Sequence, residues 1–167
     1  MNFVRAIKHG CSGHWLVQRY FSAAALAAIT QAVQVCEQQH PGEIRVAIEA
    51  ALHPLAALRG VTPRQRAVEV FAQQRVWDTE HNNGVLIYFL LADQAVEIVA
   101  DRFVARGRVP QAEWDAACRQ IETHFRDRRF EAGAVAGVQA VATILARYPP
   151  GPSDVGNELP DTPLILT

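Results

Sequence analysis

The chain has 167 residues, half of them hydrophobic, which is enough to bury the core of one globular domain. Its 16 basic and 17 acidic residues nearly balance, so there is no general positive field of the kind that attracts nucleic acid. No apolar run approaches the roughly 20 residues of a membrane-spanning helix, and the first 20 residues lack the apolar centre of a secretory signal, so we expect a cytoplasmic protein with no nucleic-acid partner and no membrane insertion.

The first third of the chain predicts an N-terminal arm, a helix and a strand. Residues 1–21 are mixed in character and form the arm. Ser22 is a good N-cap for a helix from about 22 to 39, whose apolar residues recur at helical spacing. Residues 43–49 alternate between polar and apolar, which predicts a half-buried strand with its glutamates on the solvent face.

The middle of the chain predicts a helix followed by two strands. Thr62 and Pro63 are typical of the start of a helix, which we expect to end near residue 75. Residues 85–91 are apolar on both faces, as in a central strand that helices cover on each side. A turn at 92–94 then leads into a third strand at 96–101.

The last third predicts two helices and a tail. One helix begins near Pro110, and the second runs from about 131 to 147. Residues 149–167 are rich in proline and read as a disordered tail, apart from a short apolar tip at 164–166. The expected architecture is therefore one α/β domain over 22–148, a three-layer α/β/α sandwich with a mixed sheet and helices on both faces.

Topology predicts which edge of this sheet gathers polar side chains. If the second and third strands form a hairpin, Asp101 ends beside Gly84, where the second strand begins. A parallel first strand places Glu43 at the same edge. The usual rule for open α/β sheets instead puts ligands at the carboxyl ends of the parallel strands, here Glu49 and the loops at 50–61 and 92–94, so two edges compete.

The acidic edge has the oxygen ligands that a hard cation needs. Calcium takes six to eight oxygens in flexible geometry, and magnesium is the alternative ion. Glu43 is a weaker candidate ligand. The predicted metal-binding residues come from the loop before the second strand and from the end of the third strand: Asp78, Glu80, Asn82, Asn83 and Asp101.

Simpler interpretations of the same residues stay open. The sequence 82–84, Asn-Asn-Gly, is typical of a turn, and Asp101 pairs with a neighbouring arginine in this interpretation. Arg102 and Arg106 are candidate anion-binding residues, which a metal-dependent phosphatase would need, but they are equally well explained as solvated loop charges. Trp77 is a loop anchor and Trp114 a core residue in the simpler interpretation.

Several common kinds of site are excluded by spacing. None of the three serines lies in a nucleophile elbow, and no glycine-rich phosphate loop is present. The six histidines and three cysteines show no zinc-ligand spacing. The loop is not an EF-hand, because Gly84 comes one place late and the twelfth position is Phe89, inside a strand.

Four segments carry a resemblance to a known family: 42–49 (GEIRVAIE), 76–88 (VWDTEHNNGVLIY), 96–102 (VEIVADR) and 129–133 (RFEAG). In this order they resemble the TPM domain family, over about residues 22–147. The resemblance implies an α/β/α sandwich and a divalent cation, most often calcium, bound through acidic loop residues. Plant relatives in the thylakoid lumen serve photosystem repair and have acid phosphatase activity, and bacterial relatives often carry a signal peptide and a membrane anchor.

Three functions follow as hypotheses. The first is a cation-binding accessory or interaction module, with a protein partner not identified by the sequence. The second is a weak metal-dependent acid phosphatase that hydrolyses phosphomonoesters. The third is a structural interaction domain in which the acidic loop only turns the chain.

Overall fold

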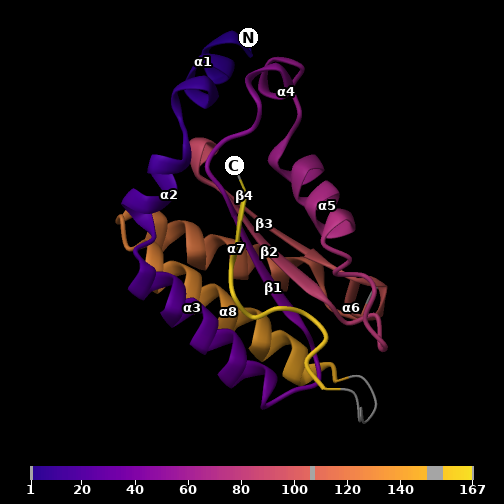
Figure 1. Ribbon diagram of the computed structural model, residues 1–167. Helices are drawn as coiled ribbons and strands as arrows, with labels where there is room; N and C mark the ends of the chain where they lie inside the picture. The colour runs from indigo at the N-terminus through magenta and orange to yellow at the C-terminus, as the bar shows by residue number, and fades with distance from the viewer. Residues whose placement is uncertain (1, 106–107, 150–155, 167) are drawn as a thin grey trace.

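A mixed four-stranded sheet with helices on both faces forms the domain in a computed structural model, which describes residues 2–105, 108–149 and 156–166 (Figure 1). The predicted α/β sandwich is thereby confirmed. The strand order is β3-β2-β1-β4, with β1 parallel to β2 and β4, and β2 antiparallel to β3. The elements are α1 Phe3–Cys11, α2 His14–Tyr20, α3 Ala23–Glu37, β1 Ile44–Glu49, α4 Pro54–Leu58, α5 Pro63–Gln73, β2 Val85–Leu90, the 3₁₀ turn η1 Leu91–Asp93, β3 Ala95–Ala100, α6 Arg102–Ala105, α7 Gln111–Arg126, α8 Phe130–Arg147 and β4 Leu164–Leu166.

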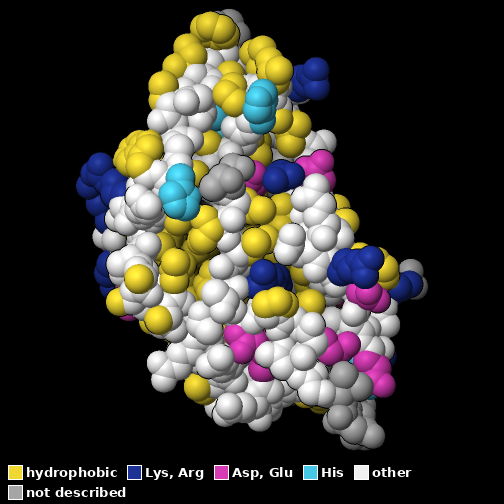
Figure 2. All heavy atoms as spheres, in the orientation of Figure 1, with side chains coloured by type: hydrophobic (Ala, Val, Ile, Leu, Met, Phe, Trp, Pro, Cys, Tyr) yellow, Lys and Arg dark blue, Asp and Glu magenta, His cyan; other side chains and the backbone are white. Residues whose placement is uncertain are grey.

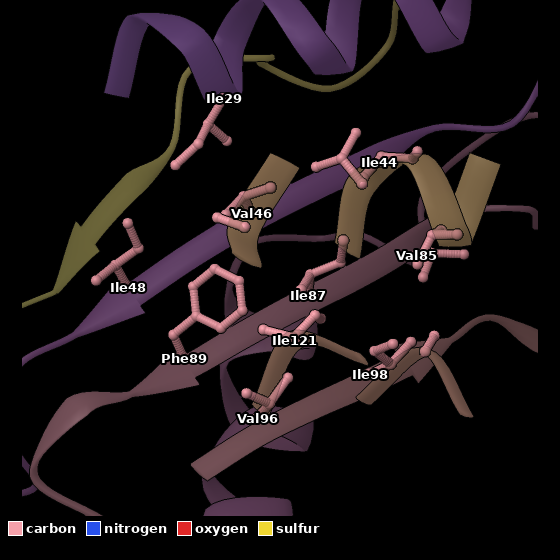
Figure 3. Packing of buried hydrophobic residues seen from close by; sticks show 14 of the residues in the cluster. Ile29, Ile44, Val46, Ile48, Val85, Ile87, Phe89, Val96, Ile98 and Ile121 are labelled. Carbon is pink, nitrogen blue, oxygen red and sulfur yellow. The ribbon is translucent and has the colours of Figure 1, made fainter. Parts of the chain in front are cut away.

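Strand β2 is buried along its whole length, and its two faces belong to two separate hydrophobic clusters. Ile87 and Phe89 face the larger cluster, where they meet residues such as Ile121 of α7 (Figure 3). Leu86 and Tyr88 face the smaller cluster, which includes Val70 of α5 and other side chains from that helix. The alternation of a strand therefore explains why a continuous apolar run needs helices on both sides.

The helices divide into two layers around the sheet. Helices α7 and α8 pack on each other and on the sheet, and α3 packs on α8, while α5 covers the opposite face against β2 and β3.

The predicted helix starts are confirmed by their caps. Ser22 Oγ accepts a hydrogen bond from Ala25 N, and Thr62 and Gln65 form a capping box at the start of α5.

The chain from residue 156 onwards differs from the predicted disordered tail, because it adds strand β4 to the sheet. Leu164–Leu166 pairs with β1 in parallel, opposite Ala47 to Glu49. The buried Arg45 fixes this segment by donating hydrogen bonds to the carbonyl oxygens of Pro160 and Thr162. Residues 150–155 of the predicted tail lie outside the described residues.

Strand β1 is fully buried, so the prediction of a half-buried strand is wrong. It lies between β2 and β4 and is covered on both faces. Glu43 and Glu49 are accordingly buried and hydrogen-bonded to protein groups, although the sequence placed them on a solvent face. Within the described ranges, no helix is both long and apolar enough to cross a membrane.

Gly84 gives a direct test of how the acidic loop sits on the sheet. A Cβ atom there would lie 2.0 Å from the carbonyl oxygen of Val76, which is backbone and cannot swing away. We expect Gly84→Ala to lower the free energy of unfolding by about 2–3 kcal/mol in urea denaturation, because the loop must shift to relieve the overlap. Gly156→Ala is the matched control, since no described residue lies within 4 Å of its added Cβ, and a cost equal to that of Gly84→Ala would contradict this packing.

Candidate functional site

The predicted convergence at one edge of the sheet is confirmed by backbone hydrogen bonds. Val85 N donates to Glu43 O at 2.8 Å, so β1 and β2 begin side by side. Asp101 N donates to Gly84 O at 2.9 Å, which places the end of β3 beside the start of β2. The edge therefore combines residues from three parts of the chain, as the hairpin and the parallel pairing require.

Asn83 holds the loop before β2 in place. Its side-chain Oδ1 accepts from Thr79 Oγ1, its backbone N donates to the same hydroxyl, and its Nδ2 donates to Pro41 O. The amide of Asn83 is thus used within the protein and is not directed at a ligand. Its neighbour Asn82 adopts a left-handed conformation with φ of 52°, and its carbonyl accepts from Phe103 N. These bonds support the interpretation of the loop as a turn, and they bring Asn82 to the start of α6.

Asp101 carries a buried carboxylate oxygen that has no hydrogen-bond partner among the described residues, and the same holds for the ring nitrogens Nε2 of His40 and His81 at this edge. The residue is 7% exposed, and its Oδ1 accepts from Arg102 N at 2.6 Å at the start of α6. Its Oδ2 is buried and has no hydrogen-bond partner in the part of the chain that the structure describes. A buried carboxylate oxygen is costly when unpaired, since burial removes it from water without compensation.

The other predicted carboxylates lie around Asp101 without closing on it. The Asp78 side chain is exposed and 3.9 Å from the Arg75 guanidinium. Glu80 lies 3.8 Å from His81, and its backbone N donates to the Glu158 carboxylate at 3.0 Å. Among the described residues, no three His, Cys, Asp or Glu side chains lie close enough together to hold a metal ion. Binding of a cation here therefore requires the exposed side chains to move.

A small basic cleft adjoins this edge. It has a volume of about 480 Å³, and Arg108 stacks over the Phe103 ring within it, at 4.0 Å from the ring centre. Arg102, a predicted anion-binding residue, lines the cleft, whereas Arg106 lies outside the described residues. The cleft is lined by His81, Asn82, Arg102, Phe103 and Arg108.

A neighbouring acidic cleft of about 680 Å³ was not predicted. Four carboxylates line it, Glu37, Glu43, Glu158 and Asp161, with no lysine or arginine among the described lining residues. Burial, reinforced by the charges of Glu43 and Asp161, raises the pKa of Glu37 to about 8 against the hydrogen bond from Ile44 N. Burial likewise raises the pKa of Glu43. The sequence showed these acids, but half of them lie in the segment that it assigned to disorder.

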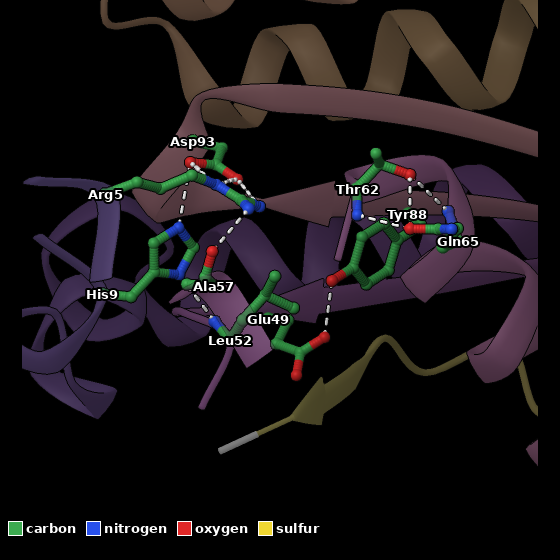
Figure 4. A network of polar contacts seen from close by, with 9 residues as sticks. All are labelled: Arg5, His9, Glu49, Leu52, Ala57, Thr62, Gln65, Tyr88 and Asp93. Carbon is green, nitrogen blue, oxygen red and sulfur yellow. Dashed lines mark hydrogen bonds and ion pairs between the residues drawn. The ribbon is translucent and has the colours of Figure 1, made fainter. Parts of the chain in front are cut away.

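The competing edge, at the carboxyl ends of β1 and β2, opens into a larger cleft of about 720 Å³. Figure 4 shows Glu49 hydrogen-bonded to Tyr88 there, and Arg66 is paired with Glu49 and Glu69. Glu49 accepts from the Tyr88 hydroxyl at 2.5 Å and from Arg66 Nε at 2.9 Å. Burial and the adjacent carboxylate raise the pKa of Tyr88, so its hydroxyl keeps its proton as donor. Arg66 and Tyr88 were missed because their partner Glu49 was placed on the surface.

His9 of α1 also lines this cleft, and both of its ring nitrogens are occupied. Nδ1 accepts from Leu52 N at 2.9 Å, so the proton resides on Nε2, which donates to Asp93 Oδ1 at 2.9 Å. An imidazole fixed in this way is neither a free base nor a metal ligand. The side chains of Glu49 and His9 in the larger cleft are therefore satisfied, whereas at the acidic edge Asp101 Oδ2 has no hydrogen-bond partner in the described ranges.

The comparisons with known proteins agree with this architecture. The model of the TPM domain matches residues 17–144. The BA42 protein of the psychrophilic bacterium Bizionia argentinensis is similar in structure, with a TM-score of 0.75 and 29% identity over 87% of this chain and 95% of that one. The N-terminal domain of a P. gingivalis protein has a TM-score of 0.61 at 17% identity, covering 80% of this chain and 83% of that one. The N-terminal domain of the cg2496 protein of Corynebacterium glutamicum has a TM-score of 0.56 at 14% identity, covering 83% and 80%, and these two likenesses concern the fold alone. No curated protein matches the chain.

The raised pKa of Glu37 predicts a loss of stability at alkaline pH. An unfolded glutamate loses its proton near its ordinary value of 4.5, but the folded Glu37 keeps its proton up to about 8. The contribution of Glu37 is therefore fully present below pH 4.5 and is lost as the pH rises through 8. The variant Glu37→Gln retains an acceptor for Ile44 N. We expect its free energy of unfolding to exceed that of the parent by about 1–3 kcal/mol at pH 8 and to equal it at pH 4.5. Glu131→Gln, at an exposed position of α8, is the control, and urea titrations that show the same pH dependence in all three proteins would contradict the prediction.

Proposed function

The chain belongs to the TPM domain family, since the family model covers residues 17–144, and from this premise we propose that it binds a divalent cation, calcium in preference to magnesium, at its acidic edge. The observation that carries the proposal is the buried Oδ2 of Asp101, which has no partner among the described residues. A cation would provide this oxygen with a positively charged partner. Hard divalent ions prefer carboxylate and amide oxygens of the kind that the neighbouring loop carries.

The proposed ligand set combines one fixed carboxylate with loop side chains that would reorient on binding. Asp101 provides the fixed anchor, because its Oδ1 is held by the start of α6. Asp78 and Glu80 lie on the loop with exposed side chains that reorient at little cost. Asn82, two residues after Glu80, would contribute an amide oxygen. Asn83 holds the loop and does not contact the ion through its amide. Calcium tolerates irregular coordination completed by water, which suits one fixed ligand and several that close on binding.

We infer a binding module in preference to an enzyme. Asp101 Oδ1 lies 4.0 Å from Arg102 Nε, whereas its Oδ2 has no hydrogen-bond partner among the described residues. The buried charged groups of the opposite cleft are paired with each other. An accessory role requires a cation and a surface and no nucleophile. We place the protein in the cytoplasm, which suits cysteines that are free at all three positions, Cys11, Cys36 and Cys118.

The test is the thermal midpoint of chelator-stripped protein with added calcium, magnesium, manganese or zinc. Binding to the native state at a hundredfold excess over the dissociation constant raises stability by about 2.7 kcal/mol. We expect calcium to raise the midpoint of the parent and to have no effect on Asp101→Asn. This variant keeps Oδ1 as the acceptor for Arg102 N, so the start of α6 is preserved. Without the unpaired charge, its midpoint in chelator should equal or exceed that of the parent.

Two further proteins make this result specific. Asp115→Asn changes an exposed carboxylate on α7 and should respond to calcium as the parent does. Asp78→Ala with Asp101→Ala should lose the response completely. If no ion shifts the parent, or if Asp101→Asn responds fully, the cation site is not at this edge and the loop is only a turn.

A metal-dependent phosphatase is the second candidate, and the basic cleft beside Asp101 is the observation that favours it. There Arg102 would hold the phosphoryl oxygens, a cation at Asp101 would polarise them, and an acidic side chain would activate water. Such an enzyme should hydrolyse p-nitrophenyl phosphate and lose the activity with chelator. Arg102→Ala should lower kcat/KM at least tenfold, because the variant loses the guanidinium that would bind the phosphoryl oxygens through charge-assisted hydrogen bonds. Cation binding without chelator-sensitive turnover would leave the binding module as the function.

A further inference from the structure

Helix α1 presents polar residues to the protein and apolar residues to the solvent, the reverse of an ordinary surface helix. Its polar residues Arg5 and His9 point inward, where both contact Asp93 in the turn between β2 and β3 (Figure 4). Its large apolar residues point outward: Phe3 is 60%, Val4 70% and Ile7 53% exposed. Surface helices normally place the apolar stripe against the core, so this face is available to something outside the domain.

The inward polar contacts fix this orientation. Arg5 donates to the Asp93 carboxylate at 2.7 and 3.0 Å and to Ala57 O at 3.4 Å, while the ring of His9 is held on both sides. Rotating α1 to bury its apolar face would leave Asp93 and Leu52 N without these partners. That cost makes the outward apolar face a fixed property of the fold.

Helix α4 extends the same apolar surface. It packs against α1, and Asn2 Nδ2 donates to Leu58 O between them. Leu55 and Leu58 of α4 are both about half exposed. We call α1 and α4 together the apolar tip. Five of the nine exposed large hydrophobic side chains among the described residues lie on it, so the exposure is concentrated in one place.

Helices α1 and α4 carry only positive charges, whereas Glu49 and Glu69 line the cleft beside them and are both paired with Arg66. Residues 2–36 and 50–68 contain no aspartate or glutamate, whereas they contain six lysine or arginine residues. Lys8 on α1 and Arg59 after α4 are exposed, and Asp93, the acid held at the base of α1, is already paired. Figure 2 shows hydrophobic atoms over the tip, at the top, and Asp and Glu side chains only below it.

We propose that the apolar tip docks on an anionic lipid bilayer, with its apolar side chains in the headgroup region and Lys8 and Arg59 against the lipid charges. Apolar and basic residues on one helical surface, without acids, are the chemistry that binds such an interface. A second copy of this chain fits less well, because a symmetric contact would set Lys8 and Arg59 against their own counterparts. The helix lies on the membrane and does not cross it, in agreement with the lack of a spanning helix in the described ranges.

The experiment is flotation of the full chain with vesicles of phosphatidylcholine alone or with 30% phosphatidylglycerol. We expect binding to the anionic vesicles only, weakened by salt. Phe3→Ser with Ile7→Ser should lower the partition coefficient tenfold or more, and Lys8→Ala should lower it about fivefold, the equivalent of ~1 kcal/mol for one basic residue. Val68→Ser, an exposed apolar position on α5, is the matched control and should bind as the parent does.

The same variants test the alternative that the apolar tip is an interface between two copies of this chain. All variants should keep the parent's thermal midpoint, since the altered side chains are exposed. No binding to either vesicle, or equal binding to both, would overturn the proposal. So would a dimer in light scattering that Phe3→Ser with Ile7→Ser converts to a monomer, because the tip would then be an interface between copies. The cation proposal is independent of this result, since it concerns the other end of the sheet.

Discussion

Burial of β2 on both faces is the constraint from which the rest of the domain follows. A strand whose six residues are all apolar or aromatic and buried cannot leave either face to water, so helices must cover both. The α3, α7 and α8 layer and the α5 layer meet this requirement. Once both faces are covered, only the two ends of the sheet can present polar groups to solvent or to a ligand. Function must therefore lie in the loops at these ends.

The two ends of the sheet carry different chemical groups, although the acidic and basic residues of the whole chain nearly balance. The start of β1 and β2 meets the carboxylates of Glu43, Asp101 and the acidic loop. The other end of the same strands lies under α1 and α4, where the acids Glu49 and Asp93 are paired with Arg66 and Arg5. The parallel pairing of β1 and β2 explains the segregation, since it brings both strand starts to one edge and both strand ends to the other. A near-zero net charge therefore describes a polarised molecule here, not a neutral surface.

Much of the fold was predictable from the sequence because its local signals agree with its packing. The caps at Ser22 and Thr62 and the apolar run of β2 were each predicted and are each present. The meeting of Glu43, Gly84 and Asp101 also followed from connectivity alone. These features depend on neighbours in sequence or on the pairing of successive strands.

The features that the sequence did not reveal depend on contacts between distant segments. Strand β4 is three residues long, and its place in the sheet depends on β1 and on Arg45, more than a hundred residues away. Composition could not show that contact, and without it Glu43 appeared to face solvent. The role of Asn83 was likewise hidden, because its side chain is used by Thr79 and by a distant Pro41. The orientation of α1 depends on Asp93, which helical periodicity cannot report.

The polarity of the molecule has a consequence for how its two ends would work together. An anionic surface attracts the acid-free tip and repels the carboxylates at the opposite edge, so both forces favour the same orientation. In that orientation the strands of the sheet lead away from the lipid, and Asp101 lies at the far end of β3 from the turn that anchors α1. A cation at Asp101 would reduce the negative charge of that edge without contacting the membrane. The separation of the two proposed sites along the strands would thus let one end contact a membrane while the other remains open to solution.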